Sequence, residues 1–360
     1  AEFVDTKLYC ADAVQEYGRG VSSRGWRAIV GESYSRCSRD LAVLGSVFDT
    51  VQVSASSTSP TLDATDRYPF FARTVPSDTG LLHAITRYVV QHGWRRVGVL
   101  HSDGPYGQNM ASWLEALLAA EHVSTLGSPY TFGDPSSIDD AVSRLAGGGG
   151  ASPPRIIVAV VNSLELEDIA DMAVAKGLLG PGRQWIFSDG SQFAHGQVMR
   201  NGAAYDGSVA IYAAGPRANN SRWYALRAEW PGYAWADFAA QISVPGGSGD
   251  VAADAAWDFA TPLGIYAAFG YDAMASLALG LCATGGDTAG PALYPAVKAQ
   301  RFVGASGEVA FDAAGTRDVS TAPFVLDNVR YDSATGAMAV AATGSFDGDA
   351  DAWVLDAFGP

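Results

Sequence analysis

The chain has 360 residues, a length typical of about two domains at ~150 residues each. Its residues are 48% hydrophobic and only 17% charged, which excludes an intrinsically disordered chain. The net charge of −15 at pH 7 disfavours binding to nucleic acids or anionic lipids, and no stretch approaches the ~18 consecutive apolar residues of a membrane-spanning helix.

The first two-thirds of the chain alternate between strand and helix patterns. Strands are expected at residues 4–10, 26–31, 51–53, 96–100, 155–161 and 184–187. Helices are expected at residues 11–21, 38–48, 79–92, 109–120, 137–145 and 164–179. Repeated strand–helix units with continuously apolar strands predict an α/β fold, in which helices cover both faces of parallel sheets.

The last third changes character. Residues 219–260, rich in Trp, Ala and Gly, show no clear period and contain the glycosylation pattern Asn219-Asn220-Ser221. A long helix is expected at residues 266–282. Strand-like runs separated by turns follow at residues 308–311, 324–331 and 338–346.

Three cysteines, Cys10, Cys37 and Cys282, are too few for a disulfide framework and form no CxxC pair. We expect Cys37 to pack in its helix as a small apolar side chain. The histidines are scattered and form no metal-binding motif, so no metal or cofactor is implied. The first residues carry no signal-peptide pattern, and we expect the chain to begin inside a domain.

Hydroxyl side chains gather where expected strands give way to helices. They are Ser35, Ser56, Ser57, Thr58 and Ser59. Ligands of open α/β sheets bind at the carboxyl ends of strands, where the free N–H groups of helix N-termini attract anions. The pattern therefore favours a carboxylate site, although helix capping explains the same serines.

Several phrases resemble the ligand-binding ectodomains of class C G-protein-coupled receptors, most closely those of metabotropic glutamate receptors. They also resemble the wider group of natriuretic-peptide-receptor-like, type I periplasmic-binding-protein domains. The likeness runs through residues 31–35, 56–59, the phrase YPFFARTVPSD at 68–78, 93–101, 106–107, Ser188-Asp189-Gly190, and FVGASGEVAFD at 302–312.

This resemblance implies a two-lobed type I periplasmic-binding-protein-like α/β fold with parallel sheets flanked by helices. Lobe 1 would comprise residues 1–76 and 214–321, with its N-terminal βα unit missing, and lobe 2 residues 77–213 and 322–360. Three crossings would join the lobes, which close over a small ligand.

The resemblance also implies ligand-binding residues in both lobes. Ser35 would hold the α-carboxylate of an amino acid, the loop at Ser56 would supply further donors, and Thr58 would accept from the α-ammonium group. A zwitterion requires donors at one end and acidic acceptors at the other.

In lobe 2, Asp78 would lie near the ammonium group, Tyr106 would cover the ligand, and Asp189 would pair with the ammonium group. Each has an ordinary alternative: Asp78 as a helix cap, Asp189 as part of a turn, and Tyr106 as an aromatic residue resting on the core.

Two departures bear on the ligand. Tyr34 and Arg36 replace small residues beside Ser35, and Asn162-Ser163 stands where glutamate receptors carry an acidic residue and a glycine. The resemblance therefore implies an α-amino acid or a related small polar ligand, rather than glutamate specifically.

The function implied is a non-enzymatic extracellular receptor ectodomain, a homo- or heterodimer that transmits lobe closure and reaches the membrane only through segments outside this chain. A free amino-acid-binding protein of a transport system is the alternative with the same fold. An interaction domain without a ligand also stays open. An enzyme is disfavoured, because no GxSxG, dinucleotide or metal motif is present.

Overall fold

The computed structural model describes residues 3–4, 6, 9–148, 150, 152–193, 196–215, 220–232, 242–243, 263, 266–348 and 350–355. The chain divides into two units: unit 1 comprises Ala1–Ser77 and Gly215–Ala322, and unit 2 comprises Asp78–Ala214 and Pro323–Pro360. None of the helices in these described stretches is long and apolar enough to cross a membrane.

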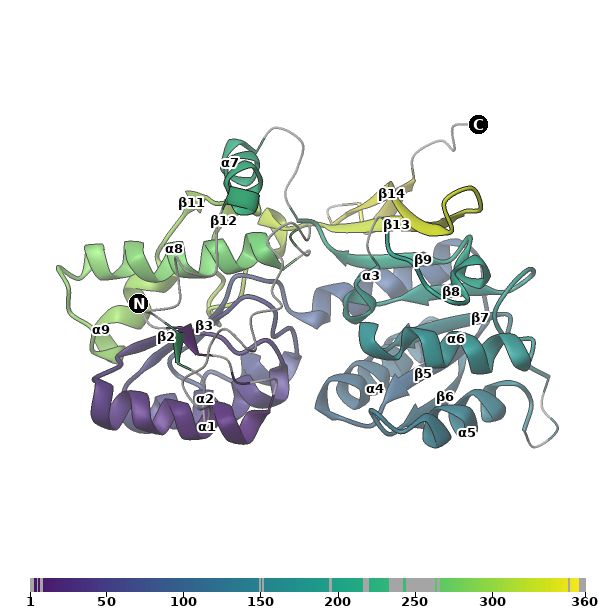
Figure 1. Ribbon diagram of the computed structural model, residues 1–360, viewed down its shortest axis with the longest axis horizontal. Coiled ribbons are helices and arrows are strands. Elements are labelled where there is room, and N and C mark those ends of the chain that lie inside the picture. The colour runs from purple at the N-terminus through teal and green to yellow at the C-terminus, as the bar shows by residue number, and fades with distance from the viewer. Residues whose placement is uncertain are drawn as a thin grey trace. The chain divides into compact units, whose positions relative to one another are not determined.

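Unit 1 contains a three-stranded parallel sheet in the order β2-β3-β4, with helices on both sides (Figure 1). The sheet strands are β2 (Ala28–Val30), β3 (Val51–Ser54) and β4 (Phe71–Arg73). The helices are α1 (Cys10–Arg19), α2 (Ser35–Phe48), α7 (Ser221–Glu229), α8 (Ala267–Ala283) and α9 (Gly290–Lys298). Two short pairs complete the unit: β1 (Phe3–Val4) with β10 (Ile242–Ser243), and β11 (Phe302–Val303) with β12 (Glu308–Val309).

The central strand β3 is buried along its whole length. Val51 and Val53 pack with Leu277 of α8 and Leu293 of α9, while α1 and α2 cover the opposite side of the sheet (Figure 1). Because helices cover both faces of the sheet, side chains on both sides of β3 are buried.

A buried ion pair fixes the late FVGASG phrase to α8. The Asp272 carboxylate accepts hydrogen bonds from the Ala305 and Ser306 N–H groups at 2.5 and 3.0 Å. Arg317, also buried, donates to the Thr74 carbonyl at 3.1 Å and lies 4.0 Å from Asp272. The segment at residues 302–307 is therefore held against α8 and contributes to the packing of unit 1.

Unit 2 is built on an eight-stranded sheet in the order β15-β14-β13-β9-β8-β7-β5-β6. Its strands are β5 (Arg96–Ser102), β6 (Ser124–Tyr130), β7 (Ile156–Val160), β8 (Gln184–Phe187), β9 (Val209–Ala213), β13 (Phe324–Asp332), β14 (Ala337–Asp347) and β15 (Ala352–Leu355). Its helices are α3 (Asp78–Gln91), α4 (Pro105–Ala120), α5 (Pro135–Leu145) and α6 (Leu166–Ala175).

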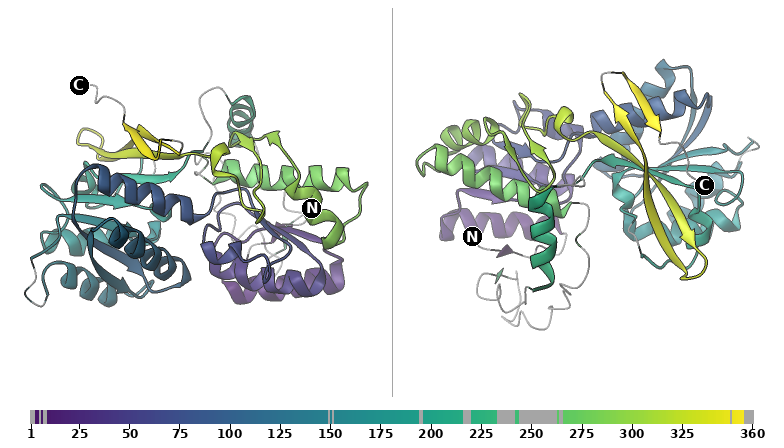
Figure 2. Two further views of the ribbon diagram at one scale, coloured as in Figure 1. Left: turned by 180° about the vertical axis from the view of Figure 1, so that it is seen from behind. Right: turned by 90° about the horizontal axis from the view of Figure 1, so that it is seen from above.

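The strands β5 to β9 are parallel, and β13, β14 and β15 extend the sheet in antiparallel fashion. Alternate residues of β7 face opposite cores: Ile157 packs against α5 and α6, and Val158 against α3 and α4. The two views from front and back show these helix pairs on opposite faces (Figures 1 and 2). This is the two-sided burial that continuous apolar strands predict.

The predicted α/β class is confirmed, with several corrections. The strand expected at residues 4–10 is wrong for most of its length, because β1 ends at Val4, Thr6 and Tyr9 lie in no strand, and Cys10 opens α1. The helix expected at 164–179 is shorter, since α6 follows a 3₁₀ turn and ends at Ala175. The sequence analysis also missed eight of the described α-helices and β-strands: β4, β6, β9, β10, β11, β15, α7 and α9.

Candidate functional site

The first candidate residue, Ser35, opens α2 in unit 1. Tyr34 precedes the helix in an extended conformation, and no side chain caps the helix. An uncapped helix start leaves N–H groups of the first turn without backbone partners, and the helix dipole favours an anion there. The Ser35 Oγ is buried and accepts a hydrogen bond from the Ser59 N–H at 3.2 Å, so its own proton remains available to donate.

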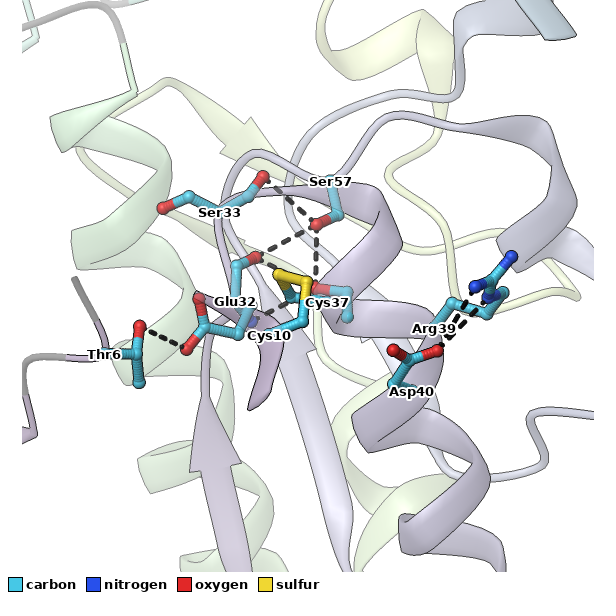
Figure 3. The surroundings of a disulfide bond; sticks show 9 residues. Thr6, Cys10, Glu32, Ser33, Cys37, Arg39, Asp40 and Ser57 are labelled. Carbon is cyan, nitrogen blue, oxygen red and sulfur yellow. Dashed lines mark hydrogen bonds and ion pairs between the residues drawn. A yellow bond between two sulfur atoms is a disulfide. The ribbon is translucent and has the colours of Figure 1, made fainter. Parts of the chain in front are cut away.

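Three serine hydroxyls converge on the Glu32 carbonyl just before α2. They are Ser54 at 2.8 Å, Ser38 at 3.0 Å and Ser57 at 3.0 Å. Figure 3 shows Ser57 directed toward the backbone of Glu32 and Ser33. The loop after β2 and the loop after β3 are thereby tied together, which brings the carboxyl ends of both strands to one place.

The remaining unit 1 candidates, Ser56 and Thr58, lie on the loop after β3. The Ser56 hydroxyl donates to the Ser33 carbonyl at 3.3 Å. Thr58 is 5% exposed, and among the described residues neither its N–H nor its hydroxyl has a hydrogen-bond partner. Ser35, Ser56 and Thr58 are thus brought to two loops that touch one another.

A disulfide joins Cys10, the first residue of α1, to Cys37 in the first turn of α2, with the Cα atoms 4.7 Å apart (Figure 3). The expectation that Cys37 packs as a free apolar side chain is therefore wrong. The pairing depends on the fold bringing two helix starts together, which the spacing of the cysteines does not reveal. The remaining cysteine, Cys282, is free and exposed.

In unit 2, the structure brings together Tyr106 and Asp189. The Tyr106 hydroxyl donates to Asp189 Oδ1 at 2.7 Å and lies 3.1 Å from Ser188 Oγ. Tyr106 is the second residue of α4, after β5, and Asp189 opens a 3₁₀ turn directly after β8. Both side chains therefore lie at the carboxyl ends of parallel strands, and the Asp189 side chain is nearly buried.

Two glycines that the sequence analysis did not assign a role allow this contact. A Cβ atom on Gly190 would lie 2.5 Å from the Val161 carbonyl oxygen and 2.9 Å from the Tyr106 hydroxyl. A Cβ on Gly107 would collide with the backbone of Ser102, at the end of β5. Close approach of backbone segments is a recognised use of glycine.

The sixth candidate, Asp78, is the first residue of α3 and is buried. A carboxylate at a helix N-terminus is stabilised by the helix dipole. A role as a helix cap and a role beside an ammonium group both stay predictions.

The departure at Asn162 has a structural explanation. Its Oδ1 accepts from the Leu164 N–H at 3.0 Å and caps the turn after β7. Just beyond it, Glu165 is buried and accepts from the Tyr130 hydroxyl at 2.5 Å and from the Gly133 N–H at 3.0 Å. Burial raises the pKa of the Glu165 carboxyl.

The candidate residues of the two units differ in chemistry. Those of unit 1 offer N–H and hydroxyl donors, which suit a carboxylate. Those of unit 2 offer a carboxylate and a phenol, which suit a cationic group. Within the described residues, no group of three or more His, Cys, Asp or Glu side chains is arranged to hold a metal ion.

Comparison with known proteins identifies similar ligand-binding regions. A family model described as the receptor family ligand binding region matches residues 2–322. The metabotropic glutamate receptor of Drosophila melanogaster is 31% identical over 191 residues, covering 52% of this chain and 19% of the receptor. The gamma-aminobutyric acid type B receptor subunit 2 of Rattus norvegicus is 29% identical over 139 residues, covering 39% of this chain and 14% of the receptor.

Among solved structures, an ABC transporter substrate-binding protein from Desulfitobacterium hafniense superposes with a TM-score of 0.64 at 18% identity, covering 90% of this chain and 84% of the other. This likeness shows the fold alone. The chain spans a fifth or less of the length of the Drosophila and Rattus receptors. Receptor ligand-binding regions and substrate-binding proteins bind ligands and are not enzymes. The match over residues 2–322 shows that the chain belongs to the receptor family ligand binding region, with the fold of periplasmic substrate-binding proteins.

Proposed function

We propose that this chain is the ligand-binding region of a receptor for a small amino-acid-like ligand. The observation that carries the proposal is the pairing of opposite chemistries on the predicted residues. The uncapped start of α2 and the unpartnered Thr58 N–H suit a carboxylate, and Asp189 with Tyr106 suits an ammonium group. A zwitterion carries both groups.

In the proposed complex, the ligand carboxylate accepts hydrogen bonds from the Ser35 hydroxyl, the first N–H groups of α2 and the Thr58 N–H. The Thr58 hydroxyl oxygen accepts from the ligand ammonium group. The loop at Ser56 contributes further donors. The ligand ammonium group pairs with Asp189, while Tyr106 keeps its hydrogen bond to that carboxylate and covers the ligand. Asp78 adds a second negative charge for the ammonium group.

The named ligands of the relatives, glutamate and gamma-aminobutyric acid, are both amino acids, which supports this class of ligand. We further propose that the ligand contacts both units, and that the resulting closure is transmitted to a dimer partner or a membrane segment. The disulfide Cys10–Cys37 supports an extracellular location, because disulfides persist in oxidising compartments. A free amino-acid-binding protein of a transport system remains the alternative, and the gene sequence beyond residue 360 distinguishes the two.

Isothermal titration against the twenty proteinogenic amino acids and gamma-aminobutyric acid tests the proposal. We expect at least one to bind, and Ser35→Ala, Thr58→Val and Asp189→Asn each to weaken its affinity about 10- to 100-fold, the loss typical of a hydrogen bond to a charged group. Ser46→Ala is the matched control, since this hydroxyl of α2 is exposed and contacts only the Val43 carbonyl. Absence of binding to the whole panel, or equal affinity of the Ser35 and Ser46 variants, would contradict the proposal.

A further inference from the structure

Arg73, the last residue of β4, has a fully buried side chain directed at the loop after β3. Its Nη1 donates to two carbonyl oxygens of that loop, those of Ser57 at 2.9 Å and Ser59 at 3.0 Å. The guanidinium group thus holds the backbone on both sides of Thr58. Among the predicted ligand-binding residues, Thr58 is the one whose N–H and hydroxyl have no partner in the described part of the chain.

These two hydrogen bonds determine where Thr58 points. The Ser57 carbonyl and the Thr58 N–H belong to one planar peptide group, in which a trans bond sets C=O and N–H in opposite directions. Because the Ser57 oxygen faces Arg73, the Thr58 N–H faces away from it. On the other side, the Ser59 N–H is held by Ser35 Oγ at 3.2 Å, so the loop is fixed against the start of α2.

Arg73 is itself held rigidly. Its Nη2 forms an ion pair with Asp63, and its Nε donates to Thr316 Oγ1 at 3.0 Å. Asp63 in turn accepts from Ser77 Oγ at 2.8 Å and from Thr316 Oγ1 at 3.0 Å. A planar guanidinium with several fixed partners has little freedom, whereas a lysine ammonium in its place could not bridge the same acceptors in one geometry.

We propose that Arg73 is a positioning residue that directs the Thr58 N–H toward the ligand carboxylate. Affinity for the ligand then depends on a side chain that never touches it. The proposal rests on the proposed function for the identity of the ligand, but its structural core, control of the loop at residues 57–59, is independent of any ligand.

Unit 1 supplies a matched control in Arg317. This arginine is equally buried, and it donates to the Thr74 carbonyl and to Ser306 Oγ at 3.1 and 2.9 Å. None of its hydrogen bonds reaches the loop at residues 57–59. Arg73→Lys and Arg317→Lys therefore remove comparable buried hydrogen bonds from the same unit, and only the first acts on the loop.

The first test needs no ligand. Hydrogen exchange followed by mass spectrometry reports the protection of the Ser57 and Ser59 amides, which are bonded to Ser54 Oγ and Ser35 Oγ. We expect Arg73→Lys to accelerate exchange in the peptide covering these residues at least 10-fold, and Arg317→Lys to leave it within about 2-fold. Equal exchange in the two variants would overturn the positioning role, whether or not a ligand is known.

The second test is titration of both variants with the amino acid of the panel that wild type binds most tightly, at a temperature well below both unfolding midpoints. We expect Arg73→Lys to weaken binding about 10- to 100-fold and Arg317→Lys by less than about 3-fold. Equal loss in both arginine variants would overturn the proposal. If wild type binds nothing in the panel, the proposed function fails while hydrogen exchange still decides the role of Arg73.

Discussion

The two units hold their candidate residues by different means. In the described part of unit 1, the sheet has three strands, and polar links hold the loops: a disulfide, the buried Arg73, and hydroxyls on the Glu32 carbonyl. In unit 2, apolar cores on both faces of a larger sheet fix the strand ends that carry Tyr106 and Asp189. A small sheet with little apolar surface to bury gains more from specific polar and covalent links than a large one.

The largest expected effect comes from removing the disulfide. Cys10→Ser with Cys37→Ser opens a cross-link between residues 27 apart in sequence, and we expect unit 1 to lose roughly 3–4 kcal/mol, because its unfolded state gains chain entropy. Denaturant unfolding followed by hydrogen exchange in peptides of each unit measures the loss separately.

The control for this experiment is Cys282→Ser, because this thiol is exposed and forms no disulfide. We expect it to leave both units unchanged. An equal loss of protection in unit 2 peptides, or a negligible loss in unit 1, would contradict the view that covalent and polar links stabilise unit 1 in particular.

A change of intermediate size is expected from disturbing the close packing around Gly190 in unit 2. Gly190→Ala places a Cβ against the Val161 carbonyl and the Tyr106 hydroxyl, so we expect a loss of about 2 kcal/mol in unit 2 and a weakened Tyr106–Asp189 contact. Gly104→Ala is the matched control, since nothing lies within 4 Å of its added Cβ. Thermal unfolding of both variants measures the difference, and equal midpoints would show that close approach at Gly190 is unimportant.

Much of the sheet of unit 2 follows from local sequence. The apolar run at residues 184–187 is observed as β8 with the same bounds, because a strand buried on both faces is continuously apolar. The edge strand β6, with its Ser, Gly and Pro residues and partly exposed side chains, carries no such signal and was missed. α9 was missed because it contains Pro295 within the helix, and proline ordinarily marks a break.

The candidate site is less accessible to sequence reasoning. Resemblance to a family supplied Ser35, Ser56, Thr58, Asp78, Tyr106 and Asp189, and their roles as ligand contacts remain predictions. The links that position them join residues far apart in the chain: Arg73 and Thr316 are separated by 243 positions, and Tyr106 and Asp189 by 83. No local period or spacing encodes such pairs, so the buried arginine and the disulfide emerge only from the fold.

The smallest expected effect concerns a buried carboxyl of unit 2 that has no cationic partner in the described part of the chain. Asp327 on β13 accepts a hydrogen bond from the Tyr212 hydroxyl on β9, and burial raises the pKa of its carboxyl. Since the folded state then binds the proton more tightly than the unfolded state, the stability contributed by this group is complete below the unfolded pKa and is lost as pH rises through the folded pKa. Asp327→Asn cannot ionise, so relative to wild type we expect it to gain on the order of 1 kcal/mol between pH 4 and pH 7, a typical size for a buried polar group.

The exposed Asp332, at the end of the same strand, supplies a control of opposite sign. Hydrogen bonds from the Ala334 N–H and the Thr335 hydroxyl lower the pKa of its carboxyl, so its contribution is present above the unfolded pKa and is lost as pH falls through the folded pKa. Relative to wild type, Asp332→Asn is therefore expected to lose stability as pH rises through the acid range to the unfolded pKa of about 3.9. Urea unfolding of Asp332→Asn below about pH 5 and of Asp327→Asn between about pH 4 and pH 7 measures the two slopes. Slopes of the same sign would mean that burial does not raise the pKa of the Asp327 carboxyl. Unit 2 would then tolerate a buried charge, as unit 1 does at Arg73.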